Sequence, residues 1–215
     1  MNADNKVVAF IHDTAVIDPG ARIGKNVKIG PYAVIGPHVE IGEGTKVWHF
    51  SHIQSGARIG KKCSFGQNVN VSNNVKIGDG CKVQNNVSLY EGVELEDYVF
   101  CGPSCVFTND LTPRAKYPKG HVGYKRTIIH HDATLGANCT IVCGHEIGEY
   151  ATIAAGAVVT KSVEPHALMA GVPAKRIGWV CECGQVLDDQ LACPDCGRRY
   201  EVRNNSVTIR GGGTT

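Results

Sequence analysis

Aromatic side chains and long apolar runs are scarce in this sequence. Two Trp, seven Tyr and five Phe are spread over 215 residues, whereas glycine occurs 26 times. This balance argues against a bulky globular core and favours many short strands joined by tight corners. No apolar run approaches the roughly 20 residues of a membrane-spanning helix. The first residues, "MNADNKVVAFIH", lack the pattern of a signal peptide, so we expect a cytoplasmic protein.

An excess of charge is also missing. Lys and Arg number 22 and Asp and Glu number 20, so nothing indicates a surface for nucleic acid or membrane. The ten cysteines contrast with these absences. In a chain expected to stay in the cytoplasm they predict reduced thiols or metal ligands rather than disulfides.

The sequence does contain a six-residue repeat. Every sixth residue from Ile11 to Phe107 is apolar, and the rhythm returns from Ile129 to Val159. Small or β-branched residues recur four positions after most of these, and glycine often follows them directly. Hexapeptide periodicity is typical of a parallel β-helix. Three units close one coil, so residues 18 apart stack at about 4.8 Å, and stacking buries the apolar face of each coil.

The repeat is interrupted once and stops before the C-terminus. Residues 108–127 are too long and too polar for a coil, and such a loop is usually functional. Its basic residues suit a phosphate or carboxylate ligand, although a solvated flap is the plain alternative. We therefore predict an all-β protein with a β-helix over residues 1–165, a protruding loop, and a small Cys-rich appendage over residues 166–215.

Stacking residues 18 apart predicts a neutral polar patch on one side of the β-helix. Its three columns are His49–Gln67–Asn85, Phe50–Asn68–Asn86 and His52–Asn70–Ser88. An asparagine ladder, in which amides bond along stacked strands, explains Asn68 and Asn86 equally well. It does not explain the mixed column of His49, or the contrast with the charged face that follows Ile23 and Ile41. An uncharged patch suits a protein interface or a sugar.

Small residues continue the same face beyond the loop. They are Gly136, Ala137 and Asn138 on one coil and Ala154, Ala155 and Gly156 on the next. Tight packing at corners explains them by itself. A shallow trough with exposed backbone would also hold a long thin ligand such as a pantetheine arm, and continuity with the polar patch favours this interpretation.

Five segments carry a closer resemblance: "VWHFSHI" (47–53), "VQNNVSLY" (83–90), "VFCGPSCVFTND" (99–110), "ATLGANCTIVCG" (133–144) and "ALMAGVPAKRIGW" (167–179). They resemble the nucleotide-sugar 3-N-acetyltransferases of lipopolysaccharide sugar synthesis, which have the left-handed β-helix of hexapeptide-repeat acyltransferases. The likeness is greatest to members that acetylate UDP-2-acetamido-3-amino-2,3-dideoxy-glucuronate. It implies acetyl-coenzyme A as the donor and a homotrimer with active sites between subunits.

The resemblance also implies where the ligands meet the chain. The catalytic candidates are Asn85, His49 and His52. The candidates for binding the sugar nucleotide are Gln67, Gln84, Asn86, Asn109, Asp110 and Arg114. The candidates for binding coenzyme A are Gly136, Ala137, Asn138, Ala154, Ala155, Gly156, Lys161, Lys175 and Arg176.

The expected chemistry defines what these residues would do. A sugar amine attacks a thioester carbonyl, and preorganised N–H groups near Gly136 and Ala137 would stabilise the oxyanion. A base would help the amine lose its proton. Asn85 cannot be a base but can orient the amine. His49 and His52 can be bases or simply hydrogen-bonded interface residues, and the departing thiolate is an alternative proton acceptor.

Three alternatives remain open at this point. The enzyme can instead acetylate a dTDP-linked 3-amino-dideoxyhexose. The β-helix can be a binding or scaffold trimer without catalysis. A metal-dependent lyase like the γ-class carbonic anhydrases needs three convergent histidines, and no third histidine falls at a position matching His49 and His52.

The appendage contains its own motif. Cys181, Cys183, Cys193 and Cys196 have a spacing close to that of zinc ribbons. "CPDCG" is a good knuckle, whereas "CEC" is one residue shorter than the usual pair. The sequence allows a structural Zn²⁺ or four free thiols.

Overall fold

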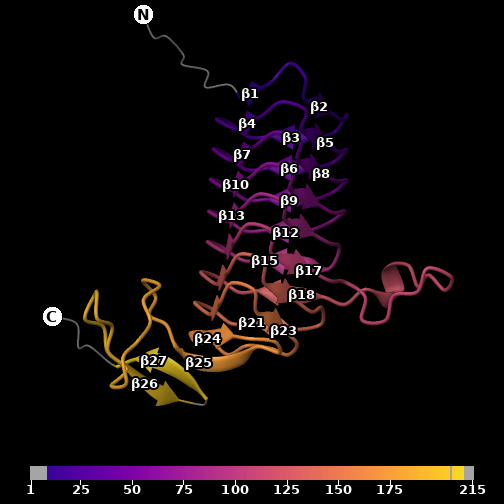
Figure 1. The fold of residues 1–215 in the computed structure, drawn as a ribbon. Helices are drawn as coiled ribbons and strands as arrows, with labels where there is room; N and C mark the ends of the chain where they lie inside the picture. Colours follow the sequence, from indigo (N-terminus) through magenta and orange to yellow (C-terminus); the bar gives the residue numbers. More distant parts are fainter. Residues whose placement is uncertain (1–8, 204, 211–215) are drawn as a thin grey trace, which may run out of the picture.

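The computed structural model describes residues 9–203 and 205–210. The repeat folds into a parallel β-helix whose six-residue units are mostly two-residue strands joined by corners, as Figure 1 shows. The prediction of a parallel β-helix is therefore confirmed. Three sheets, named A, B and C here, form its sides.

Sheet A contains β1 (Phe10–Ile11), β4 (Lys28–Ile29), β7 (Lys46–Val47), β10 (Ser64–Phe65), β13 (Lys82–Val83), β16 (Phe100–Cys101), β19 (Thr134–Leu135), β22 (Thr152–Ile153), β24 (Ala167–Ala170) and β25 (Lys175–Trp179). Sheet B contains β2 (Val16–Ile17), β5 (Val34–Ile35), β8 (His52–Ile53), β11 (Asn70–Val71), β14 (Ser88–Leu89), β17 (Val106–Phe107), β20 (Thr140–Ile141) and β23 (Val158–Val159). Sheet C contains β3 (Arg22–Ile23), β6 (Glu40–Ile41), β9 (Arg58–Ile59), β12 (Lys76–Ile77), β15 (Val93–Leu95), β18 (Thr127–Ile129) and β21 (Glu146–Ile147).

The register is that of the repeat. Lys28 lies opposite Lys46, 18 residues later, and the same step recurs up each sheet. The loop does not shift this phase, because Cys101 pairs with Leu135 and Leu135 pairs with Ile153. The small residues at 136–138 and 154–156 therefore continue the corner that carries the amides, as the sequence predicted.

The core follows from the alternation within each unit. The last residue of each strand from β4 to β22 is apolar and buried, and small residues such as Ala33 and Cys63 fill the spaces between. Many corners need a backbone with positive φ at their second turn residue. Asn68 and Asn86 have φ of 56° and 61° there, and asparagine tolerates this conformation better than other non-glycine residues.

The outer faces of the three sheets differ in charge. Sheet A carries Lys28, Lys46 and Lys82, and sheet C carries Arg and Glu on consecutive strands. The neutral columns do not lie on the flat of sheet A. They lie at the corner between sheets A and B, and on sheet B itself. The outward residues of sheet B are Val16, Val34, His52, Asn70, Ser88, Val106, Thr140 and Val158.

Two segments leave the β-helix. The loop between β17 and β18 reaches away from the coils in Figure 1 and contains the short helix η1 (His121–Gly123). At the other end β24 still pairs with β22, and β25 turns back on β24 in antiparallel fashion. A hairpin of β26 (Tyr200–Arg203) and β27 (Ser206–Ile209) follows. No helix in the described part of the chain is long and apolar enough to cross a membrane.

Candidate functional site

The corner between sheets A and B brings the predicted amides together. Asn68 Nδ2 donates to Asn86 Oδ1 at 3.2 Å, so the asparagine ladder exists at this pair. One column away, Asn85 Oδ1 accepts from the backbone N–H of Gln67 at 3.0 Å. The amides therefore have a structural role, and both Asn85 and Asn86 remain exposed to a ligand.

The hydrogen bond accepted by Asn85 also occurs at another corner of the β-helix, where aspartates accept it. Asp79 Oδ1 accepts from the N–H of Lys61, and Asp97 Oδ1 accepts from the N–H of Asp79, both at 2.7 Å. Each side chain thus clamps the corner one coil before it. The clamp needs Gly66 beneath it, because a Cβ there would lie 2.2 Å from Asn85 Oδ1. An aspartate would make the same bond but would bring a charge to a neutral corner.

A hollow of about 120 Å³ lies beside the amide corner. Asn86, Ser88 and Tyr90 line one side of it, and Val106 and Phe107 line the other. The two last residues form β17, from which the loop departs. The fold therefore brings the amide corner and the root of the loop together beside one hollow. Tyr90, at the end of the same "QNNVSLY" segment, is an additional lining residue.

Within the loop, the predicted ligand residues separate into paired and unpaired groups. Asp110 forms an ion pair with Lys119 and also accepts from the N–H of Thr112 at 2.8 Å. The Lys119 ammonium holds the pKa of Asp110 below its usual value. The carbonyl of Asn109 accepts from the N–H of Lys125. These contacts shape the base of the loop.

Arg114 lies in the exposed part of the loop. Within residues 9–203 and 205–210, the only hydrogen bond of its side chain is a 3.4 Å contact to the carbonyl of Pro113. Arg126, by contrast, is held by two hydrogen bonds to Glu94, at 2.6 and 3.1 Å. Arg114 is therefore available to an anionic ligand, whereas Arg126 is occupied.

The predicted trough has free backbone donors. The N–H of Gly136 donates to the carbonyl of Ile153 at 2.8 Å, so it already takes part in the hydrogen bonding between coils. The N–H groups of Ala137 and Ala155 have no acceptor among the described residues. A side chain at Gly136 would bring its Cβ within 2.5 Å of the backbone nitrogen of Ala155. A side chain at Gly136 would therefore crowd the backbone of the next coil, and the free N–H at this corner is that of Ala137 rather than that of Gly136.

The other residues predicted for coenzyme A lie either at this corner or further along the chain, after β23. Asn138 donates its N–H to Pro103, and Gly156 donates its N–H to Ala137 at 2.9 Å, so both support the corner. Lys161 is exposed after β23, and Lys175 is exposed at the start of β25. Arg176 lies over the ring of Trp179 at 4.2 Å and contacts Asn205, so it is partly committed to the appendage.

The two candidate histidines lie on an earlier coil than Asn85. His49 occupies the same column two coils away, which is about 9–10 Å at the strand spacing. Its ring meets the edge of Phe50, which stacks on Tyr32 at 5.4 Å. His52 points outward from sheet B between Val34 and Asn70. Within one chain, both histidines are therefore two coils away from Asn85.

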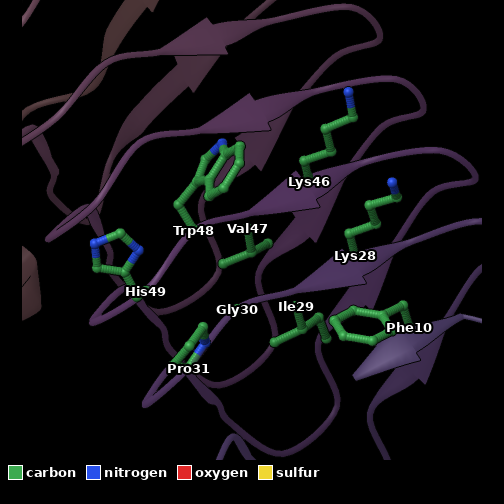
Figure 2. A pocket seen from close by; sticks show the side chains of 9 residues that line it. All are labelled: Phe10, Lys28, Ile29, Gly30, Pro31, Lys46, Val47, Trp48 and His49. Atoms are coloured by element: carbon green, nitrogen blue, oxygen red, sulfur yellow. The ribbon is translucent and has the colours of Figure 1, made fainter. Parts of the chain in front are cut away.

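A second hollow lies higher on the β-helix, and the sequence analysis did not find it. Figure 2 shows Trp48 on one side of it, Lys28, Lys46 and Phe10 on the other, and Val47 and Ile29 between them. The hollow measures about 250 Å³. Flat aromatic walls beside two ammonium groups can accept a planar ring next to an anion. The sequence did contain a signal for this hollow, because Phe10, Lys28 and Lys46 are spaced 18 residues apart and therefore stack on consecutive coils.

A titratable cluster lies on sheet C, on the side of charged residues. His130 contacts Glu96 through Nδ1 at 3.1 Å and Glu146 through Nε2 at 3.0 Å. Partial burial lowers the pKa of His130, but the bonds and charges of Glu146 and Glu96 outweigh it and raise the pKa above its usual value. This imidazole thus joins two carboxylates, one from the coil before it and one from the coil after it.

Comparison with known families agrees with the repeat. A model described as "Bacterial transferase hexapeptide (six repeats)" matches residues 9–43 and 38–73. A model described as "Hexapeptide repeat of succinyl-transferase" matches residues 56–91 and 126–161. LpxA from Acinetobacter baumannii superposes with a TM-score of 0.54 at 21% identity, covering 79% of this chain and 74% of that one. The fold is a left-handed parallel β-helix of hexapeptide repeats.

Two curated relatives share shorter stretches. A dTDP-3-amino-3,6-dideoxy-alpha-D-galactopyranose 3-N-acetyltransferase from Aneurinibacillus thermoaerophilus is 43% identical over 88 residues, which are 40% of this chain and 45% of that protein. A 2,3,4,5-tetrahydropyridine-2,6-dicarboxylate N-acetyltransferase from Enterococcus faecalis is 46% identical over 50 residues, which are 23% of this chain and 22% of that protein. The chain spans less than half the length of either relative.

Proposed function

We propose that this protein transfers the acetyl group of acetyl-coenzyme A to the amino group of a nucleotide-linked amino sugar. The observation that carries the proposal is the continuity of one corner. Exposed amides at Asn85 and Asn86 suit a sugar, and the same corner continues into the unpaired N–H groups of Ala137 and Ala155. The 43% identity to a nucleotide-sugar 3-N-acetyltransferase supports this class of reaction.

In the proposed reaction the sugar amine attacks the thioester carbonyl carbon. The N–H of Ala137 stabilises the oxyanion, the C–S bond then breaks, and the amine proton passes to the leaving thiolate. Asn85 orients the amine or its neighbouring hydroxyl group. Because both histidines of the same chain are two coils away from Asn85, the thiolate is the acceptor that needs no further group. A histidine from a neighbouring copy is the competing possibility.

We further propose a homotrimer that packs through sheet B. Its eight outward residues include no Lys, Arg, Asp or Glu, and two of them, Val16 and Val106, are about half exposed in the single chain. The amide corner borders this sheet, so a neighbouring copy and its loop would cover the sugar. Sedimentation at micromolar concentration tests the assembly, and a stable monomer would contradict it.

The finer substrate is a UDP-linked 2-acetamido-3-amino-2,3-dideoxy uronate in this proposal. The named relative from Aneurinibacillus favours a second candidate, a dTDP-linked 3-amino-dideoxyhexose. Purified protein assayed with acetyl-coenzyme A and both nucleotide sugars distinguishes them by free thiol release and by the mass of the product. If neither sugar is acetylated and calorimetry finds no binding of acetyl-coenzyme A, the protein is a scaffold rather than this enzyme.

A further inference from the structure

Four sulfur atoms converge in the C-terminal appendage, outside the proposed acetyl-transfer site. The Sγ atoms of Cys181, Cys183, Cys193 and Cys196 all lie within 4.8 Å of one another. Cys181 and Cys196 are 3.5 Å apart, and so are Cys183 and Cys193. A disulfide requires about 2.05 Å. Tetrahedral zinc with bonds of about 2.3 Å separates its sulfur ligands by about 3.8 Å, which is close to the distances seen here.

The backbone around each cysteine pair is shaped as a tight turn. Gly184 and Gly197 follow the two pairs with φ of 93° and 73°, a conformation that favours glycine. Their N–H groups donate to the carbonyls of Cys181 and Cys193, at 2.8 and 3.0 Å. The N–H of Cys196 also points at the sulfur of Cys193, at 3.5 Å. The short Cys-x-Cys spacing therefore still brings both of its sulfur atoms into the cluster.

Groups around the cluster donate to sulfur rather than accept from it. The hydroxyl of Tyr200 donates to Cys181 Sγ at 3.2 Å, and Arg198 Nη1 lies 3.7 Å from Cys196 Sγ. Four thiolates around one dication keep two negative charges in excess. Hydrogen-bond donors and a guanidinium around the ligands are the arrangement that stabilises such a centre.

The appendage has little else to hold it together. Its buried core consists of Cys181, Leu187, Cys193, Tyr200 and Val207. Units with so small a core need a metal or disulfides to fold, and two of these five residues are in the sulfur cluster.

We propose that these four cysteines bind one Zn²⁺ in a closed structural site. The ion fastens the appendage as a cap on the last coil of the β-helix, and a row of contacts links the two. Tyr150 stacks on the buried ring of His166 at 4.9 Å, and His166 meets Tyr200 at 5.4 Å. Tyr200 reaches Cys181, and His166 Nδ1 donates to the carbonyl of Val180 at 2.9 Å.

The test uses the full-length protein and needs no enzyme assay. Purified protein should contain one zinc per chain by mass spectrometry of the metal. After chelation and reloading with Co²⁺, it should show the intense visible bands of a tetrahedral thiolate site. Zinc should also protect thiols. Cys183 and Cys196 are the two exposed cysteines, so zinc-loaded native protein should react slowly with a thiol reagent until a chelator is added.

Variants separate the ligands from the turn that carries them. Cys183→Ser should weaken zinc binding by at least roughly tenfold and lower the melting temperature. Asp195→Asn, in the Cys193–Cys196 knuckle but without a ligand atom, should do neither. Freshly reduced protein that gives no tetrahedral cobalt bands would overturn the proposal. So would an intact mass showing two disulfides in that segment, or rapid labelling of Cys183 and Cys196 without a chelator in protein supplied with zinc.

Discussion

Asn85 Oδ1 accepts a hydrogen bond from the backbone N–H of Gln67 at 3.0 Å, so this side chain clamps the preceding corner before any ligand arrives. Its clamp and its proposed substrate contact can be separated, because Asp79 and Asp97 make the same bond elsewhere. Asn85→Asp should keep the clamp, and Asn85→Ala should lose about 0.5–1.5 kcal/mol of stability with it.

The two Asn85 variants should nevertheless share a catalytic defect. Orientation of the sugar by the amide donor predicts a kcat lower by about 10–100-fold, the effect of roughly 1.5–3 kcal/mol. Steady-state kinetics well below the melting temperature measures this effect. If Asn85→Asp has the kcat and KM of the unchanged protein, Asn85 serves the corner alone.

His49→Ala and His52→Ala test the route of the proton. With the leaving thiolate as acceptor, each variant should keep kcat within about tenfold of the unchanged protein, and the acidic limb of the pH–rate profile should persist. A general base would instead cost about 10²–10⁴-fold and remove that limb. Such a loss in either variant, with the fold intact by circular dichroism, would assign the proton to a histidine from a neighbouring copy.

Arg114→Ala should raise the KM for the sugar nucleotide by about tenfold or more, since a charge-assisted bond to phosphate contributes roughly 1.5–3 kcal/mol. The KM for acetyl-coenzyme A should barely change. Lys116→Ala is the matched control, because Lys116 lies in the same loop beside the ring of Tyr117. If Trp48→Ala raises the KM for the sugar nucleotide and Arg114→Ala does not, the nucleotide occupies the hollow of Figure 2 instead.

The His130 cluster predicts a pH-dependent stability. A histidine whose folded pKa lies above the unfolded value of about 6.5 stabilises the protein fully below that value. This stabilisation is lost as the pH rises through the raised pKa. The melting temperature should therefore fall from pH 6 toward pH 8, and His130→Ala should reduce the slope, to which His131 also contributes because its pKa is raised as well. His145→Ala, which removes a histidine outside this cluster, should leave the slope intact, and an unchanged slope in His130→Ala would refute the assignment.

The repeat was predictable because each six-residue unit makes its own strand and depends on neighbours at a fixed spacing. Ile29, Val47 and Phe65 therefore stack where periodicity puts them. Counting residues also predicted the register of the coils after the loop and the contact between Asn68 and Asn86. These features depend on one-dimensional spacing alone.

The side-chain contacts and hollows of the candidate site could not be predicted from residue spacing. Lys119 neutralises Asp110 through the conformation of a loop that has no repeat. Glu96 and His130 are 34 residues apart, because the loop intervenes between adjacent coils, so no 18-residue column reveals their contact. The clamp by Asn85 depends on the side-chain conformation, and the hollow beside Trp48 depends on three coils at once.

The constant step between coils has a consequence for how such a chain can change over generations. Since Lys28 and Lys46 occupy equivalent places, the loss or duplication of one whole coil moves the ends by about 4.8 Å and leaves all other columns in line. A change of one residue would turn every later side chain to the wrong side. A coil gained or lost before Val47 would thus leave Asn85 and Ala137 in register, whereas one gained or lost between them would change the distance between the two proposed binding places.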